Sequence, residues 1–293
     1  MLFKDGRVCS ACPGGSMLNS AVSLGRAGAE VFLLTEFADD EVGNMICRFL
    51  KENNVSAEHV SIYPDRKSPL ALAFLNRYND AIYSFYEDFP EKRYLKTASD
   101  LRPDDIVMFG SILAVSKETE PGLREFLDAA KGAGSTILYD PNFRAPHMQT
   151  PEATRMIREN IGYADIVRAS DEDMRNIEGI CNADDAYEYV HDNGCKCLVY
   201  TAGSKGVSLR APSVSKYYVT PEITTVSTVG AGDSFNAGIV YQLLREDISN
   251  EKTEAIQEPV WDRIIGRGID FASDVCKRSE NYISEGFAAR IKG

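Results

Sequence analysis

Hydrophobic and polar positions follow two different periods along this chain. Short apolar runs rich in β-branched and aromatic residues predict strands at 31–35, 70–76, 82–86, 106–110, 136–140, 166–169, 197–201, 207–210 and 216–219. Longer segments with apolar positions at helical spacing predict helices at 16–26, 41–53, 122–131, 151–160, 172–180, 186–193, 234–244 and 260–277. Because strands and helices alternate, the pattern predicts an α/β fold whose mainly parallel sheet is covered by helices on both faces.

One region departs from this alternation. Between residues 68 and 87, two strand patterns are joined by the short polar stretch 77–80, which favours a β-hairpin over a helical crossover. Such a hairpin is either a flap over a site at the strand ends or an antiparallel edge of the main sheet. No repeat or long linker interrupts the chain, which indicates one main domain with an appendage.

The charge balance excludes some classes of partner. Asp and Glu number 44 against 32 Lys and Arg, a net charge of −12 over 293 residues. This acidity argues against nucleic-acid and anionic-membrane binding, both of which use basic patches. No apolar run approaches the roughly 18 residues of a membrane span, and residues 1–15 lack the apolar core of a signal peptide. We therefore expect a cytoplasmic protein.

The seven cysteines do not form a disulfide framework, because their number is odd and they are scattered. Cys9 and Cys12 form a C-x-x-C pair, and Cys195 and Cys197 a C-x-C pair. A zinc site would need both pairs or nearby histidines, and the three histidines lie far from either pair in sequence. We interpret these cysteines as free thiols.

A glycine-rich turn carries the strongest chemical signal. Gly230, Ala231 and Gly232 precede an apolar helix predicted to begin at about Asp233. Backbone N–H groups at such a helix start form an anion site, and Asp233 is placed to take a proton from an attacking hydroxyl. The alternative is a tight turn with Asp233 as the helix N-cap. The sequence has no Walker A loop, no dinucleotide fingerprint and no nucleophile elbow.

Five blocks in order resemble the ribokinase (PfkB) family of sugar and nucleoside kinases. Gly-Ala-Gly-Asp at the mouth of a helix resembles the family's second signature. The other blocks are residues 14–28, 37–55, 140–144 and 201–206, so the resemblance extends from about residue 14 to 277. It implies a ribokinase-like three-layer α/β sandwich, a single domain over 1–293 with lid strands from 1–12 and 66–90.

The resemblance also implies roles for individual residues. Asp233 is the expected general base, and the amides of Gly230, Ala231 and Gly232 are the expected anion hole. The residues expected to line the sugar pocket are Gly14, Gly15 and Asn19, with Asn142 and Arg144 near the phosphate path. Arg144 is either a cation for developing charge or part of a surface ion pair.

The implied cofactors are ATP and Mg²⁺, often with a monovalent cation such as K⁺. The residues expected to contact the nucleotide are Thr201, Gly203, Gly206 and Ser279, the last of these in the segment 272–279 that borders the adenine. Asp173 is expected to hold a magnesium-bound water, although three acids at 171–173, with Asp171 as a cap, are also typical of a solvated helix start.

Three departures from the family pattern stand out. Ser227 occupies a position that is usually Asp, which puts the dependence on a monovalent cation in question. Ser170 replaces the Asn of the family's Asn-x-x-Glu. The first family strand, with its sugar-binding Asp, has no counterpart, because Asp5 falls too late; a gap in the sheet is therefore expected, from a truncated start or in a protein that has lost sugar kinase activity.

The resemblance predicts an ATP-dependent sugar kinase that phosphorylates a primary hydroxyl. The motifs look most like fructokinases, with ribokinase and ketodeoxygluconate kinase as alternatives. A second hypothesis is a catalytically impaired member that binds nucleotide or sugar as a regulator. An oxidoreductase is disfavoured by the absent fingerprint. Because the family often dimerises through its lid strands, we expect a homodimer through residues 70–87, or else an unpaired flap.

Overall fold

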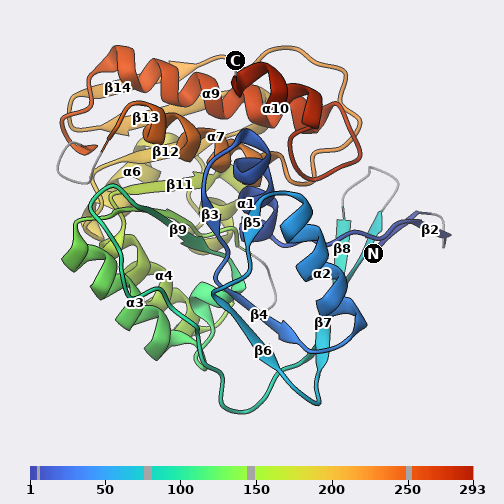
Figure 1. Cartoon of the computed structure of the whole chain (residues 1–293). Coiled ribbons are helices and arrows are strands. Elements are labelled where there is room, and N and C mark those ends of the chain that lie inside the picture. Colours follow the sequence, from blue (N-terminus) through green and yellow to red (C-terminus); the bar gives the residue numbers. More distant parts are fainter. Residues whose placement is uncertain (5–6, 76–80, 144–148, 249–252, 293) are drawn as a thin grey trace.

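A six-stranded sheet lies at the centre of the computed structural model, which describes residues 1–4, 7–75, 81–143, 149–248 and 253–292 (Figure 1). Its strands, in spatial order, are β14 (Val214–Tyr218), β13 (Val207–Ala211), β12 (Leu198–Thr201), β11 (Ile166–Ser170), β10 (Thr136–Asp140) and β9 (Ile106–Gly110). Strands β9 to β12 are parallel, whereas β13 and β14 pair antiparallel. The predicted mainly parallel sheet is confirmed.

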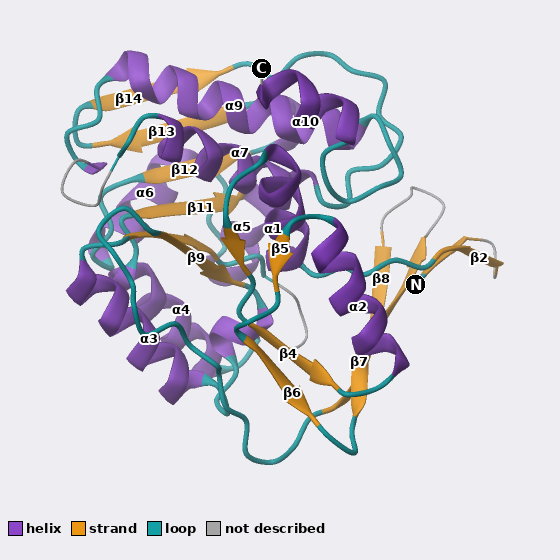
Figure 2. Ribbon diagram, in the orientation of Figure 1, coloured by secondary structure: helices purple, strands orange, loops and turns teal. Residues whose placement is uncertain are grey.

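Helices cover both faces of this sheet (Figure 2). One face packs against α3 (Glu120–Ala133), α4 (Pro151–Tyr163), α5 (Asp171–Glu178) and α6 (Ala183–Asp192). The other packs against α1 (Ser16–Ala27), α7 (Ala231–Arg245), α9 (Glu258–Cys276) and α10 (Glu285–Lys292). Ile137 and Tyr139 contribute to the first core and Leu138 to the second, because successive side chains of a strand point to opposite faces. The predicted three-layer α/β sandwich is confirmed.

The central sheet ends at β9, and the strands between residues 31 and 63 pair separately from it. The sequence led us to expect a gap in the sheet without placing it at a particular strand. Two separate two-stranded parallel sheets follow, β3 (Val31–Phe32) with β5 (Val55–Ser56), and β4 (Thr35–Ala38) with β6 (Val60–Tyr63). The single strand predicted at 31–35 is therefore two strands. Helix α1 contacts β9, β3 and β5, so it joins the sheets by packing, without a ladder between them. Helix α2 (Glu41–Glu52) follows β4.

A four-stranded sheet stands beside the main body, in the order β2 (Arg7–Ser10), β1 (Leu2–Lys4), β7 (Lys67–Leu75) and β8 (Ala81–Asp88). It projects at the right of Figure 1. Strands β7 and β8 pair antiparallel, which confirms the predicted hairpin, while its turn at 77–80 lies outside the described residues. The alternative that this hairpin forms an edge of the main sheet is wrong, because the two sheets share no strand.

The two long helices α7 and α9 pack at unusually close range. A Cβ atom added to Gly238 would lie 2.6 Å from the Arg267 carbonyl oxygen and 2.7 Å from the Gly268 Cα atom. Reciprocally, a Cβ at Gly268 would lie 2.9 Å from the Phe235 ring. Glycine at 238 is therefore required by the space between two backbones, and glycine at 268 leaves room for the Phe235 ring. In the described residues, no helix combines the length and apolar character needed to cross a bilayer.

We expect Gly238→Ala to lower the free energy of unfolding by about 1–3 kcal/mol, because the methyl group forces the two helices apart. Gly266→Ala is the matched control within α9, since a Cβ at Gly266 meets no atom within 4 Å. That change should raise stability by roughly 0.5–1 kcal/mol through helix propensity. Urea unfolding of both variants measures the difference, and equal effects would contradict the packing argument.

Candidate active site

Residues predicted to carry chemistry gather at the carboxyl ends of the parallel strands. Asp140 ends β10, Ser170 ends β11 and Thr201 ends β12. The N-termini of α1 and α7 reach the same edge, where Ser16 of α1 contacts Asp233 of α7. Ligands of open parallel sheets bind outside the carboxyl ends of their strands, so this edge is the candidate site.

The glycine turn begins α7 two residues earlier than predicted. Its N-cap is Gly230, with φ at +81°, and the helix begins at Ala231. A Cβ at Gly230 would lie 2.2 Å from the Asn281 carbonyl oxygen, so both the backbone conformation and the space require glycine. The Ala231 N–H donates to the Thr228 carbonyl at 3.2 Å. The first amides of a helix have no acceptor within the helix itself, which makes this start a donor surface.

Asp233 turns its carboxylate away from its own helix and toward α1. Ser16 Oγ donates to Asp233 Oδ1 at 2.8 Å, and Asn19 Nδ2 donates to Oδ2 at 2.8 Å. Asp233 is 9% exposed. Asp233 is not the helix N-cap, so that interpretation is wrong: Gly230 has this place, and no side chain caps it.

Sequence reasoning missed Ser16 and Ser20 as partners of this aspartate. Ser20 Oγ donates to the Asp233 carbonyl at 2.8 Å, and Ser23 Oγ exchanges a hydrogen bond with Ser234 Oγ at 3.0 Å. Ser16, Asn19, Ser20 and Ser23 recur at steps of three and four, which places them on one helical face. A stripe of small polar residues within an otherwise apolar helix is the signal that could have revealed them.

The predicted sugar-pocket residues of the first motif lie together. Gly15 is the N-cap of α1 with φ at +131°, and a Cβ at Gly14 would lie 4.0 Å from Asn19 Oδ1. Asn19 is buried, and its Oδ1 atom has no hydrogen-bond partner in the described part of the chain. Gly14 and Gly15 therefore lie at the start of α1 close to Asn19, which contacts Asp233 and presents one unsatisfied acceptor.

Asn142 occupies the turn that follows β10. Its φ is +40°, its N–H donates to Asp140 Oδ1 at 3.1 Å, and its Nδ2 donates to Ser111 Oγ at 3.2 Å. Asparagine tolerates this left-handed conformation better than most residues. Arg144 lies outside the described residues.

Asp173 is part of a capping box at the start of α5. Its Oδ2 accepts hydrogen bonds from Ser170 N at 2.9 Å and Ser170 Oγ at 2.6 Å, and Ser170 is the N-cap. Its Oδ1 accepts from the Phe143 N–H at 2.7 Å, which ties α5 to the loop after β10. The predicted Asp171 cap is wrong by one residue. The solvated interpretation of Asp173 is also wrong, since that residue is 5% exposed.

The carboxylates around Asp173 determine whether a magnesium ion fits at this edge of the sheet. No group of three or more His, Cys, Asp or Glu side chains in the described ranges is arranged to hold a metal. Asp173 Oδ1 accepts one hydrogen bond and retains a second lone pair. Mg²⁺ keeps several waters and is held by one or two carboxylates together with substrate phosphates. The residues therefore fit an ion that arrives with a nucleotide, rather than a preformed protein cage.

The residues predicted for the nucleotide lie in two segments, the end of β12 with the turn that follows it, and the loop after α9. Thr201 is buried at the end of β12, whereas Gly203 is exposed and starts the short helix η2 (Gly203–Lys205). Gly206 has a structural constraint, because a Cβ there would lie 2.5 Å from the Tyr217 hydroxyl. Ser279 is exposed in the loop after α9, two residues before Asn281.

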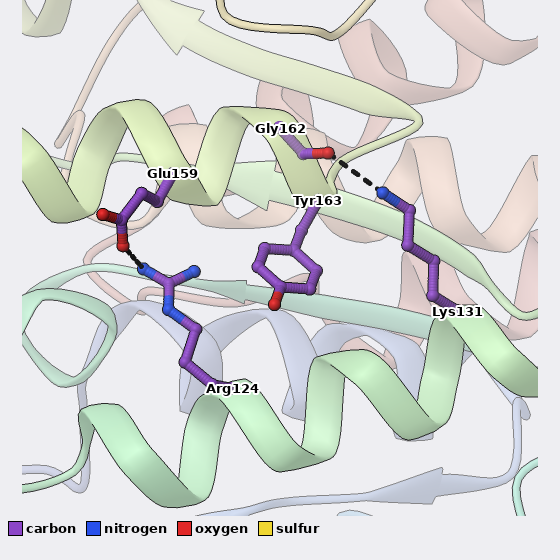
Figure 3. A pocket seen from close by; sticks show the side chains of 5 residues that line it. All are labelled: Arg124, Lys131, Glu159, Gly162 and Tyr163. Atoms are coloured by element: carbon purple, nitrogen blue, oxygen red, sulfur yellow. Dashed lines mark hydrogen bonds and ion pairs between the residues drawn. The ribbon is translucent and has the colours of Figure 1, made fainter.

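A hollow of about 340 Å³ lies near that loop. It is formed by the segment after β14 together with α9 and α10, and its lining residues are Pro221, Glu222, Ile223, Asp270, Ser273, Asp274, Lys277, Phe287 and Arg290. A second hollow, of about 350 Å³, lies between α3 and α4 (Figure 3). There Arg124 pairs with Glu159 and Lys131 donates to the Gly162 carbonyl, beside the Tyr163 ring. Helices α3 and α4 contribute no predicted site residue, whereas Ser273, Asp274 and Lys277 of the first hollow fall in the segment 272–279 that was predicted to border the adenine.

A buried arginine that sequence reasoning missed completes the site. Arg168 of β11 donates from Nη1 to Asp140 Oδ2 at 3.3 Å and from Nη2 to Thr201 Oγ1 at 2.7 Å. Asn236 Nδ2 donates to the same Asp140 oxygen at 2.6 Å. An arginine within the apolar run Ile-Val-Arg-Ala was the available signal, because a buried charge needs partners.

Burial raises the pKa of Asp140 to about 6. The Arg168 guanidinium and the Asn236 amide lower this pKa, whereas the negative charges of Asp173 and Asp233 raise it. Because the pKa in the folded protein exceeds the usual value of about 3.9, the folded state binds the proton more tightly than the unfolded state. This carboxyl therefore destabilises the fold progressively as the pH rises from about 4 through 6.

We expect the Asp140 carboxyl to titrate near pH 6 in a carbon-13 NMR experiment on aspartate-labelled protein. Exposed aspartates should titrate near pH 4 in the same spectra. Asp140→Asn removes the resonance and so provides the assignment. Titration of Asp140 at or below pH 4 would show that its hydrogen bonds outweigh its burial.

Comparison with solved structures gives the same fold. The fructokinase from Vibrio cholerae O395, in its fructose, ADP and calcium ion bound form, superposes with a TM-score of 0.82 at 18% identity over 95% of this chain and 91% of that one. The aminoimidazole riboside kinase from Salmonella enterica, complexed with aminoimidazole riboside and an ATP analog, gives a TM-score of 0.79 at 20% identity over 96% and 91%.

Comparison with known sequences identifies the family. A fructokinase of Rhizobium leguminosarum bv. trifolii is 31% identical over 249 residues, which cover 83% of this chain and 74% of the relative. Fructokinase-2 of Zea mays is 29% identical over 253 residues, covering 84% and 75%. Residues 9–259 match the model of the pfkB family carbohydrate kinases. The chain therefore belongs to the PfkB family of carbohydrate kinases.

Proposed function

We propose that this kinase transfers the γ-phosphoryl group of ATP to a primary hydroxyl of a small sugar, with fructose as the first candidate. The observation that carries the proposal is the Asp233 carboxylate, held by Ser16 and Asn19 beside the donor turn that begins α7. Ribose and ketodeoxygluconate are the alternative sugars, because selectivity rests on a few pocket side chains. The fructokinase relatives support fructose.

Asp233 is the proposed general base. Its two oxygens accept hydrogen bonds from Ser16 and Asn19, which orient the carboxylate from α1. A carboxylate in this position takes the hydroxyl proton as the oxygen attacks phosphorus. The amides of Gly230, Ala231 and Gly232 are the proposed anion hole for the group in transfer, supported by the positive end of the helix dipole. To serve in it, the Ala231 N–H would exchange the Thr228 carbonyl for the phosphoryl group.

The sugar is proposed to bind at Gly14, Gly15 and Asn19. The buried and unpartnered Asn19 Oδ1 is a natural acceptor for a sugar hydroxyl, because an unsatisfied buried acceptor is costly. Asn142 and Arg144 are proposed to lie near the phosphate path, with Arg144 as a cation for developing charge.

The nucleotide is proposed to extend from Thr201 and Gly203 toward the hollow beside α9. The lining of this hollow is mainly polar and charged, and adenine is proposed to pack against its three apolar members, Pro221, Ile223 and Phe287. Ser279 lies in the loop that follows α9.

Two cations are part of the proposal. Asp173 is proposed to hold a water on a magnesium ion that arrives with the nucleotide and neutralises phosphate charge. At the usual Asp position, Ser227 Oγ accepts a hydrogen bond from Val229 N at 3.2 Å. It offers a neutral oxygen to a monovalent cation such as K⁺, and we expect only weak dependence on that ion.

Asp233→Asn should lower kcat by about 10²–10⁴-fold, because the amide cannot take the hydroxyl proton. A coupled assay of ADP release over fructose, ribose and ketodeoxygluconate measures this loss. Asp192→Asn, an exposed position at the end of α6, is the control and should leave kcat unchanged.

This assay, together with a measurement of ADP binding, separates the proposed function from its alternative. Asp233→Asn should bind ADP as the wild type does, which would show that the site is folded. Wild-type turnover that survives in Asp233→Asn would exclude this residue as the base. Nucleotide binding without turnover on any sugar would instead favour a regulatory member of the family.

The four-stranded sheet formed by β2, β1, β7 and β8 is proposed to act as a lid and as a dimer interface. One of its faces exposes Leu70 at 40%, Phe74 at 40% and Tyr86 at 59%. Leu70 lies opposite Tyr86 across the hairpin, and Phe3 stacks on Phe74 at 4.9 Å between ring centroids. A contiguous apolar face of this kind supports contact with a second copy of the chain.

Leu70→Asp combined with Phe74→Asp should convert a dimer to a monomer in analytical ultracentrifugation, because two charges would enter the apolar interface. Val219→Asp, at a 77% exposed position after β14, is the control and should leave the mass unchanged. A wild-type protein that sediments as a monomer at micromolar concentration would exclude the interface.

A further inference from the structure

Arg168 is a buried cation to which the proposed reaction assigns no role. It is the third residue of β11, between the parallel strands β10 and β12, and it is 7% exposed. Its guanidinium lies between the residues that end those two strands, Asp140 and Thr201. Its Nε atom is buried without a hydrogen-bond partner in the described ranges. Burying a charge costs free energy, and the contacts of Arg168 indicate the role that would explain why it is buried.

The contact between Arg168 and Thr201 orients the hydrogen of the Thr201 hydroxyl group. Because Arg168 Nη2 donates to Thr201 Oγ1 at 2.7 Å, the oxygen acts as an acceptor toward the arginine. A guanidinium has no acceptor, so the hydroxyl hydrogen must point elsewhere. Thr201 can then donate that hydrogen to an acceptor in the site, such as a phosphate oxygen.

The contact with Gly232 ties the same guanidinium to the first turn of α7. A Cβ atom added to Gly232 would lie 3.0 Å from Nη2 and 3.1 Å from Nη1 of Arg168. The side chain therefore packs directly against the turn whose amides form the proposed anion hole. Phe235 of the same helix lies on another side, with its ring centroid 5.9 Å from the guanidinium carbon.

The charge of Arg168 matters because three buried carboxylates lie at the same edge of the sheet. Asp140, Asp173 and Asp233 are all buried at this edge of the sheet, and a phosphate would meet their negative charges. Arg168 forms an ion pair with Asp140 at 3.3 Å. In a medium of low dielectric constant, a fixed positive charge behind the donor turn offsets part of that repulsion.

We propose that Arg168 is a positioning residue for phosphoryl transfer, which acts through Thr201 and Gly232 and not by contact with the sugar. It directs the Thr201 hydroxyl toward the nucleotide phosphates, supports the donor turn and offsets the buried carboxylates. This inference rests on the proposed function, since it assigns the phosphates of a nucleotide to this edge of the sheet.

Arg168→Met, which keeps much of the side-chain length without the charge, should weaken ADP binding about tenfold in calorimetry without sugar. It should also raise the KM for ATP and lower kcat, while the KM for the sugar stays unchanged. Arg168→Lys keeps the positive charge but has a single donor nitrogen in place of three, so it should recover part of the ADP affinity that Arg168→Met loses. Arg210→Met is the control. Arg210 of β13 pairs with Asp184 of α6, so its replacement should not affect ADP binding.

A double-mutant cycle separates positioning from simple loss of packing. Thr201→Val should also weaken ADP binding. The double variant should bind ADP no more weakly than whichever single variant has the lower ADP affinity, because both changes remove the same hydrogen bond between Arg168 and Thr201. Fully additive losses, or wild-type ADP affinity in folded Arg168→Met, would overturn the proposal. If Arg168→Met does not fold, Arg168→Lys decides the matter: reduced ADP affinity with an unchanged sugar KM supports the proposal, and wild-type affinity overturns it.

The ADP arm needs no sugar, so the two hypotheses fail separately. Absence of turnover on every sugar, with ADP binding that depends on Arg168, would reject the proposed function and leave this inference standing. Sugar phosphorylation that is insensitive to Arg168→Met would reject the inference alone.

Discussion

The buried Asp233 carboxylate sets the arrangement of the rest of the site. A carboxylate away from water is costly unless it is hydrogen-bonded, and Ser16 and Asn19 satisfy its two oxygens from α1. Those bonds bring together helix starts more than 200 residues apart in sequence. Ser20 and Ser23 extend the same contact along α1. The glycine loop at residues 14–15 consequently lies beside the donor turn of α7, so one polar contact positions both proposed binding surfaces.

The carboxyl edge of the sheet provides a second layer behind that contact. Asp140, Arg168 and Thr201 come from three adjacent parallel strands, and their hydrogen bonds cross from strand to strand. The Asp173 capping box adds the loop after β10 to this layer. A buried network of this kind is costly when it is half satisfied, and it specifies one geometry when its groups are paired. Strand ends and helix starts therefore hold the residues of the candidate site in one hydrogen-bonded arrangement.

The alternation of periods predicted most of the fold, and the exceptions have physical reasons. Strands β5 and β6 were missed, because they have only two and four residues and are held by pairing with β3 and β4, on the far side of helix α2 in the sequence. Strands β1 and β2 lie within residues 1–12, where the resemblance led us to expect lid strands. Helix α10 was missed because its eight residues alternate charged and apolar types too briefly to show a helical face. The hairpin at 67–88 was found from local pattern, whereas its membership in a separate sheet depends on the parallel pairing of β1 with β7.

The sequence by itself determined the fold class, the order of the motifs and the glycine positions, because periodicity and backbone freedom are local properties. It indicated Asp233, Asn19 and Gly230–Gly232 as chemically important residues. Only the tertiary structure decided that Gly230 is the N-cap, that Ser16 bonds Asp233, that Asp173 is committed to a capping box, and that Arg168 lies behind Gly232. A pattern shows which face of an element is buried, but the partner of a buried polar group depends on which elements pack together.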